Sequence, residues 1–213
     1  MAGFFENIVL IPESEYGVAR VKHVVVDEHD SRMSAIRGGT SYIPKGTYMQ
    51  LWVKNEMFMS NTRFEKIANT KVVMMAKGDV LIFGLGLGMI LPEILAKKEV
   101  TSVTVVELYS DVVQLIEPHF QHPKLSIIQG DAFTFKPHQW NKRIPEKYDT
   151  IWFNIWSDYN TELLPEMGKL LRRARRWKKD ASSKADCWLR SHLLSEKRRE
   201  KGMSGDDGKR IRT

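Results

Sequence analysis

The sequence predicts an α/β fold built around a Rossmann-like parallel sheet, and three observations predict it. An apolar strand, Val80–Phe83, runs directly into a glycine-rich turn, Gly84–Gly88, and then into a helical segment, Met89–Lys98. A second apolar strand, Ser102–Glu107, ends in an acid about 20 residues after the turn, the offset at which such folds hold a ribose diol. Strands and helices then continue to alternate, which implies parallel strands joined by right-handed crossovers.

The segment before this core is expected to form a small β-hairpin unit over residues 1–60. Short alternations of apolar and polar residues, separated by Gly38-Gly39 and Pro44-Lys45-Gly46, are typical of strands joined by turns. The expected strands are Asn7–Ile11, Val18–Asp27, Met33–Arg37 and Tyr48–Val53. A helix over Asn61–Met75 then leads into the core.

The core is expected to occupy residues 61–160. After its first two strands come a helix over Ser110–His119, a strand over Leu125–Phe133, a polar loop over Pro137–Lys147 and a strand over Thr150–Trp156. No β-branched run follows Trp156, so the sheet is expected to be truncated after about four core strands. Because natural proteins cover an apolar edge strand, we expect the C-terminal helices, or the second subunit of a homo-oligomer, to lie against it.

The C-terminal segment, residues 161–201, is expected to be helical and basic, with helices over Thr161–Trp177 and Asp186–Lys201. Residues 202–213 have the composition of a disordered tail. Residues 169–213 contain 16 Lys/Arg and 6 Asp/Glu, about +10, while the whole chain carries +7, so the first 168 residues sum to about −3. This asymmetry indicates an acidic partner. The cluster Arg172–Lys179 is either a phosphate-binding face for nucleic acid or a solvated helix surface.

The composition narrows the class of protein further. The single cysteine, Cys187, allows no disulfide framework and fits a reducing compartment. The N-terminal residues lack the pattern of a signal peptide, and no stretch approaches the roughly 18 apolar residues of a membrane span. We therefore expect a cytoplasmic protein without membrane contact. The histidines are scattered and form no set at metal-ligand spacing, so no metal site is expected.

Glycine or polar residues stand at the carboxyl ends of all four predicted core strands. They are Gly84, Gly86 and Gly88 after the first, Glu107 at the end of the second, Asp131 after the third and Asn154 after the fourth. Ligands of open α/β sheets bind beyond these ends. The Gly-x-Gly-x-Gly spacing differs from the dinucleotide pattern Gly-x-Gly-x-x-Gly, and no P-loop is present. The pattern therefore predicts a nucleoside-containing ligand that has no phosphate to be cradled.

Four stretches carry a resemblance to a known family: VLIFGLGLGMILPEIL, VTVVELYSDVV, LSIIQGDAF and YDTIWFNIWSD. Over roughly residues 77–158 the chain resembles the class I S-adenosylmethionine (SAM)-dependent methyltransferases, and within them the spermidine synthase-like branch. It is also similar to phage-encoded methyltransferase-like proteins that carry GLGLGM and an IW-x-D motif followed by LPEM. The resemblance implies a class I methyltransferase-type fold and SAM or decarboxylated SAM as the cofactor.

The resemblance also implies roles for individual residues. The three loop glycines would surround the methionine portion and the ribose of SAM, and Glu107 would accept hydrogen bonds from both ribose hydroxyls. Asp131 would hold the adenine amino group, and the backbone amide of Ala132 would face a ring nitrogen. Asn154 would lie near the sulfonium centre, where transfer occurs.

Asn154 departs from the family pattern. Spermidine synthases have a catalytic aspartate at this strand end, and an amide cannot act as a general base, so polyamine synthesis by the usual mechanism is not expected. Asn154-Ile155-Trp156 half matches the [DN]PP[YFW] motif of enzymes that methylate amino groups of nucleic acids, without its prolines. Asp158 is either a displaced general base or the cap of the next helix. Trp156 either stacks on a substrate or packs in the core.

The favoured function is a SAM-dependent methyltransferase of unknown acceptor, because methyl transfer from a sulfonium depends mainly on alignment of the acceptor. One alternative is aminopropyl transfer from decarboxylated SAM, with Asp158 as a substitute base. The other is a SAM-binding module without catalysis that contacts nucleic acid or protein through its basic segment. The expected lack of later sheet strands, which build acceptor pockets, favours this last alternative.

Overall fold

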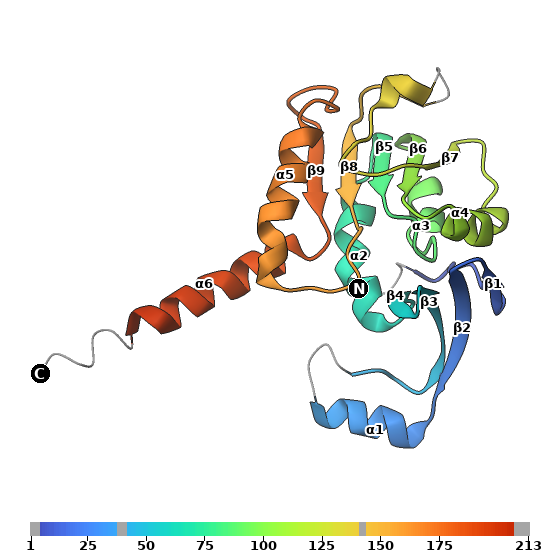
Figure 1. The fold of residues 1–213 in the computed structure, drawn as a ribbon, viewed down its shortest axis with the longest axis vertical. Helices are drawn as coiled ribbons and strands as arrows, with labels where there is room; N and C mark the ends of the chain where they lie inside the picture. The colour runs from blue at the N-terminus through green and yellow to red at the C-terminus, as the bar shows by residue number, and fades with distance from the viewer. Residues whose placement is uncertain (1–4, 38–41, 141–143, 207–213) are drawn as a thin grey trace, which may run out of the picture.

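The computed structural model describes residues 5–37, 42–140 and 144–206 and contains two β-sheets (Figure 1). The first is antiparallel, in the order β1-β2-β3-β4, and the second is parallel, in the order β7-β6-β5-β8-β9. The parallel sheet with its helices confirms the α/β, Rossmann-like fold that the sequence predicts. None of the helices within these ranges is long and apolar enough to cross a membrane.

The antiparallel sheet is built from the N-terminal strands. They are β1 (Ser14–Tyr16), β2 (Ala19–Val26), β3 (Gly46–Val53) and β4 (Glu56–Ser60). Lys54 and Asn55 join β3 to β4 with φ angles of 50° and 67°, as a two-residue hairpin turn of the primed type requires. β1 and β4 were missing from the sequence prediction, whereas β2 and β3 lie where it expects strands.

Two of the expected N-terminal strands are wrong. Met33–Arg37 belongs to a helix, α1 (Glu28–Arg37), because Asp27 starts a helix there: its Oδ1 accepts the Asp30 N–H at 2.8 Å. Asn7–Ile11 is not a strand, since Ile11 directs its backbone groups to side chains. Its N–H contacts the Met49 sulfur at 3.3 Å, and its carbonyl lies 2.8 Å from the His23 ring. The expected turn at Gly38-Gly39 lies outside the described residues.

The parallel sheet alternates with helices along the chain. Its elements are α2 (Arg63–Met75), β5 (Gly78–Phe83), α3 (Leu91–Leu95), β6 (Val100–Glu107), α4 (Ser110–Ile116), β7 (Leu125–Gln129), β8 (Thr150–Phe153), α5 (Leu164–Ala174), β9 (Lys184–Cys187) and α6 (Arg190–Asp206). The chain adds β6 and β7 on one side of β5, then returns to add β8 and β9 on the other. Such a reversal of direction opens a crevice at the carboxyl ends of the central strands.

The side chains of β5 show how the two faces of this sheet are covered. Val80 and Ile82 pack with buried residues of α2, α3 and α4, and the antiparallel sheet contributes to the same cluster. Leu81 and Phe83 point to the opposite face and pack with buried residues of α5. This two-residue alternation in a strand with both faces covered explains why β5 reads as a continuous apolar run.

The prediction that the sheet stops after about four strands is wrong. β9 pairs in parallel with β8, from Thr150 opposite Lys184 to Phe153 opposite Cys187. An ion pair between Lys71 of α2 and Asp186 of β9 ties the added strand to the sheet. The edge of β8, which was expected to lie against the C-terminal helices or a second subunit, is instead paired with a further strand of the same chain.

The last two helices also differ from the expected ranges. A 3₁₀ turn over Thr161–Leu163 precedes α5, and α6 begins at Arg190 instead of Asp186. α6 projects away from the two sheets (Figure 1) and continues to Asp206, into the segment expected to be disordered. Residues 207–213 of that expected tail lie outside the described residues.

Candidate functional site

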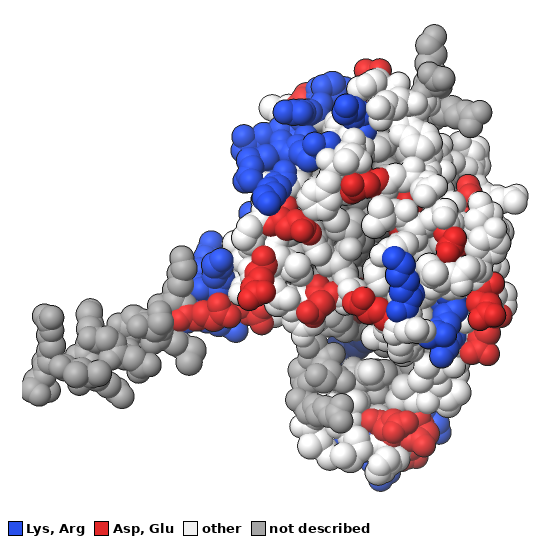
Figure 2. All heavy atoms as spheres, viewed as in Figure 1, with Lys and Arg blue, Asp and Glu red and all other residues white. Residues whose placement is uncertain are grey.

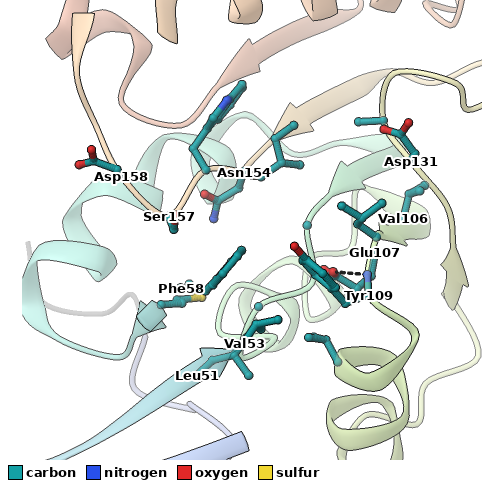
Figure 3. A pocket seen from close by; sticks show the side chains of 18 of the residues that line it. Leu51, Val53, Phe58, Val106, Glu107, Tyr109, Asp131, Asn154, Ser157 and Asp158 are labelled. Carbon is teal, nitrogen blue, oxygen red and sulfur yellow. Dashed lines mark hydrogen bonds between the residues drawn. The ribbon is translucent and has the colours of Figure 1, made fainter. Parts of the chain in front are cut away.

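A pocket of about 400 Å³ lies at the carboxyl ends of β5, β6, β7 and β8, at the point where the sheet changes direction. Its lining includes all but one of the residues that the sequence predicts as site residues: Gly84, Gly86, Glu107, Asp131, Ala132, Asn154, Trp156 and Asp158. Figure 3 shows Asp131 and Asn154 on one side of the pocket and Leu51 and Val53 on the other. Residues far apart in the sequence thus converge here, as the strand-end pattern predicts.

The glycine loop brings bare backbone to the pocket. Gly84 has a φ of 94°, and a Cβ on it would overlap the backbone carbonyl oxygen of Asn154. Gly86 has a φ of 54°, and a Cβ on it would lie 2.5 Å from the Met59 sulfur. Gly88 is the exception among the predicted residues, because it does not line the pocket; a Cβ there would overlap the Phe120 ring. Its absent side chain allows helix packing, which is a structural role.

Glu107 is a buried carboxylate held by backbone N–H groups. Its Oε2 accepts the Leu85 N–H at 2.8 Å and its Oε1 accepts the Tyr109 N–H at 2.9 Å, the bond drawn in Figure 3. Burial raises the pKa of Glu107, and these backbone hydrogen bonds oppose the rise. The backbone N–H groups of Leu108 and Gly86 also lower its pKa, so the carboxylate faces a cluster of backbone donors at this edge of the pocket.

Asp131 and Ala132 follow β7 and line the pocket. Asp131 also stabilises its own turn, since its Oδ1 accepts the Phe133 N–H at 2.8 Å and its Oδ2 lies 3.4 Å from the Thr134 hydroxyl. Asp131 therefore caps the turn that follows β7, while its side chain also lines the pocket. These two roles coexist, because a carboxylate has four acceptor sites.

Asn154 is the end of a polar chain that the sequence did not predict. Its Nδ2 donates to Asn69 Oδ1 at 3.3 Å, and the buried Asn69 donates in turn to Glu65 Oε2, also at 3.3 Å. Glu65 lies on α2 and lines the pocket. Burial raises the pKa of Glu65 to about 7. The pocket thus contains an acid with a raised pKa, which is linked to Asn154 through the buried Asn69.

Trp156 and Asp158 lie on the loop after β8. Trp156 is half-buried and lines the pocket. Its indole N–H donates to Glu166 Oε1 at 2.7 Å, which holds the ring in place. The Asp158 carboxylate is exposed and accepts the Tyr159 N–H at 2.6 Å. The cap of the next 3₁₀ turn is Asn160, whose Oδ1 accepts the Glu162 N–H at 3.0 Å. Asp158 is therefore not the cap that the sequence offered as one alternative.

The antiparallel sheet supplies a wall of the pocket that the sequence prediction also missed. Leu51 and Val53 of β3 and Phe58 and Met59 of β4 line it. The Phe58 ring meets the Tyr109 ring edge-on, with centroids 5.8 Å apart. The alternation of apolar and polar residues in β3 indicates that one face of the strand is buried. The sequence does not show that this face packs toward the glycine loop.

The pocket lining contains five acidic residues: Glu65, Glu107, Asp131, Asp158 and Glu166. No lysine, arginine or histidine is among the lining residues in the part of the chain that the structure describes. Over the same residues, no group of three or more His, Cys, Asp or Glu side chains is arranged to hold a metal ion. The pocket therefore favours a neutral or positively charged ligand.

Comparison with known proteins gives structural likeness only. No protein-family model and no curated protein matches the sequence. A spermidine synthase from Thermotoga maritima aligns with a TM-score of 0.45 and 14% identity over 79% of this chain and 52% of that one. A spermidine synthase in complex with the transition-state analogue AdoDATO aligns with a TM-score of 0.44 and 14% identity, over 79% of this chain and 52% of that one. Precorrin 8w decarboxylase from Methanobacterium thermoautotrophicum gives 0.38 and 15% identity, over 56% and 59% of the chains. The chain spans about half the length of the spermidine synthases.

Proposed function

We propose that the chain is a transferase that binds SAM or decarboxylated SAM and passes an alkyl group to an amine. The observation that supports it most is Glu107, a carboxylate held at the end of β6 beside the glycine loop. Backbone N–H groups orient it, and under the proposal the same carboxylate accepts the two hydroxyls of a ribose. Charge-assisted hydrogen bonds of this kind are stronger than those between neutral groups.

The charge of the pocket separates SAM from other nucleoside ligands. A lining that contains acids and, among the described residues, no basic side chain disfavours the phosphates of a nucleotide or dinucleotide. SAM carries a positive sulfur and no phosphate, so the same acids favour it. This agrees with the Gly-x-Gly-x-Gly spacing, which differs from the pyrophosphate-binding pattern.

The shape of the glycine loop fits a ligand that approaches backbone closely. Added Cβ atoms at Gly84 and Gly86 would overlap Asn154 and Met59, so only glycine lets the loop backbone pack this closely at the pocket. Under the proposal, the two glycines border the ribose and the methionine portion, while Asp131 and the Ala132 amide contact the adenine. These assignments remain predictions.

The acceptor end is proposed to lie between Asn154 and Glu65. SAM, when bound, supplies an alkyl group on a positively charged sulfur. Asn154 uses its Nδ2 to contact Asn69, which leaves its Oδ1 to orient an attacking amine. As the new N–C bond forms, the S–C bond of the sulfonium breaks and a neutral thioether leaves. Glu65, with its pKa raised to about 7, receives the proton that the amine loses. Proton transfer is most efficient when the pKa of the base lies near the working pH.

Methyl transfer is the first candidate and aminopropyl transfer the second. The second is favoured by one observation: Glu65, Asp158 and Glu166 all line the acceptor side, and several carboxylates suit an amine with more than one positive charge. The two reactions leave different thioethers. Incubation of the protein with a set of amines and either SAM or decarboxylated SAM, followed by mass spectrometry, distinguishes S-adenosylhomocysteine from methylthioadenosine.

The ligand class is tested by calorimetry with SAM, decarboxylated SAM and NAD on three proteins. Wild type is expected to bind a SAM form and not NAD. Glu107→Gln keeps the shape of the side chain but loses its charge, and it should weaken binding at least about tenfold, or 1.4 kcal/mol. The exposed Glu117, outside the pocket, gives the matched control Glu117→Gln, which should bind as wild type. Equal affinity for NAD and SAM, or unchanged binding in a folded Glu107→Gln protein, would contradict the proposal.

A further inference from the structure

α5 carries a row of positive side chains on one face. Lys169, Arg172 and Arg173 are spaced i, i+3 and i+4 on α5, so they lie on one side of the helix. Arg176 follows in the turn just after the helix ends at Ala174, and it lines the same hollow as the other three. We call these four residues the α5 strip. The apolar side of α5 packs on the parallel sheet. Arg172 and Arg173 in the last turn favour the helix dipole, whereas the i, i+3 and i, i+4 spacing places like charges next to one another.

The strip is not neutralised within the protein. In residues 5–37, 42–140 and 144–206, none of its four side chains forms an ion pair with a carboxylate. Lys179, a few residues further along, differs sharply: its Nζ lies 3.1 Å from Asp79 and 3.2 Å from Asp149. Lys179 is therefore neutralised by two carboxylates of the protein. The strip has no such partner among the described residues, so it can contact another anion.

Arg173 is held in place at the middle of the strip. One guanidinium nitrogen donates to the Phe135 carbonyl at 3.3 Å, and the group lies over the Trp177 ring at 5.6 Å. Its Nε is buried and has no hydrogen-bond partner among the described residues. The other three strip residues are exposed. The strip thus combines one fixed guanidinium with three accessible cations.

Two adjoining hollows follow the strip and share Arg173 and Arg176. One, of about 370 Å³, is lined by Phe133, Lys169, Arg172, Arg173 and Arg176. The other, of about 380 Å³, is lined by Phe135, Lys136, Pro137, His138, Glu146, Lys147, Arg173, Arg176 and Trp177. Together they contain a single acid, Glu146. Figure 2 shows Lys and Arg gathered over α5 and the segment next to it, apart from the acids nearer the centre of this face.

The length of this basic path matches a polymer better than a single phosphate. From Lys169 to Ala174, the last residue of α5, the helix rises about 7.5 Å, and Arg176 extends the basic path beyond it. One strand of B-form nucleic acid rises only about 3.4 Å along its axis per phosphate. Phe133, which is half-buried, lies at one end of the strip and lines the ligand pocket as well. A basic groove beside an aromatic ring is the usual arrangement for single strands, whose phosphates follow the charge while a base stacks.

We propose that the α5 strip binds the phosphate backbone of single-stranded nucleic acid, with Phe133 contacting a base at the end nearest the ligand pocket. The surface works independently of the ligand in the pocket, so the proposal stands whether or not the pocket binds SAM. The acid-lined pocket and the strip are separate sites of opposite charge, joined only at Phe133.

The test uses fluorescence anisotropy with a labelled 20-nucleotide single strand of mixed sequence, without added SAM, at several salt concentrations. The strip variant is Lys169→Gln/Arg172→Gln/Arg176→Gln, which leaves the packed Arg173 in place. The matched control is Lys197→Gln/Arg198→Gln/Arg199→Gln on α6, which removes the same one lysine and two arginines from the basic segment. Circular dichroism verifies that both variants are folded.

Wild type is expected to bind the strand, and the strip variant to bind it at least about tenfold more weakly near 0.1 M salt. The slope of log K against log salt should become shallower by about 2 in the strip variant, since each lost phosphate contact on a single strand removes about 0.7. The control should lose less than about threefold. The proposal is overturned if wild type does not bind, if both variants lose affinity equally, or if the duplex of the same sequence binds more tightly.

Discussion

Replacing Glu65 by glutamine removes a carboxyl group that stays protonated in the folded protein up to about neutral pH. Burial raises the pKa of Glu65 from 4.5 to about 7, a difference that corresponds to about 3 kcal/mol. The unfolded chain loses this proton near pH 4.5 and the folded chain only near pH 7. The folded state therefore binds more protons in this window, and the free energy of unfolding falls as pH rises through it. Above pH 7 the loss is complete.

We expect the stability of Glu65→Gln relative to wild type to rise by about 2–3 kcal/mol between pH 5 and pH 8. Glutamine does not titrate and can still accept the hydrogen bond from Asn69. The measurement is urea unfolding at unit pH steps, followed by circular dichroism. Glu162→Gln, at an exposed position outside the pocket, provides the control and should track wild type. Parallel pH profiles for wild type and Glu65→Gln would refute the raised pKa and, with it, the role of Glu65 as a proton acceptor at neutral pH.

Two further predictions follow from the loop and the single thiol. Gly84→Ala should cost at least about 3 kcal/mol of stability, because its Cβ meets the backbone of Asn154. Gly86→Ala should cost about 1 kcal/mol, because the flexible Met59 side chain can move away. Thermal melts in which Gly86→Ala is the less stable variant would contradict this prediction. Burial raises the pKa of Cys187 to about 12, so iodoacetamide at pH 8 should label it only after unfolding in urea, and rapid labelling of the native protein would show that it is not buried.

The sequence predicts the parallel core well because its signals there are local. β5 and β6 are apolar runs with both faces covered, and the glycines and acid that follow them sit where strands end. The positions of Glu107, Asp131 and Asn154 at one pocket follow from that topology alone, since parallel strands present their carboxyl ends at one edge. Their binding roles remain predictions.

β9 shows why other parts could not be predicted. Its sequence, Lys-Ala-Asp-Cys, contains no β-branched or aromatic residue and carries no strand signal. It becomes a strand because β8 offers free backbone groups and because Lys71, more than a hundred residues earlier, pairs with Asp186. Neither cause is readable from the segment itself.

Glu65 was missed for a related reason. A glutamate in the first turn of a helix is usually a solvated residue that favours the helix dipole. Here the buried Asn69 one turn later and the distant Asn154 make it part of a polar chain inside the pocket. The pair Glu65 and Asn69, spaced i and i+4, was the only local hint.

The wall that β3 and β4 contribute places residues of both sheets around one pocket, so a ligand bound there would contact both. A ligand held between Glu107 and Leu51 contacts both sheets at once, so its binding energy opposes their separation as well as the unfolding of either one. By mass action, each tenfold excess of ligand over its dissociation constant adds about 1.4 kcal/mol against any opening that parts them. Amide hydrogens of the antiparallel sheet would then exchange more slowly in the complex, although most of them touch no ligand atom. Ligand binding in the pocket would therefore slow amide hydrogen exchange even at the ends of β2 and β3 that lie away from the pocket.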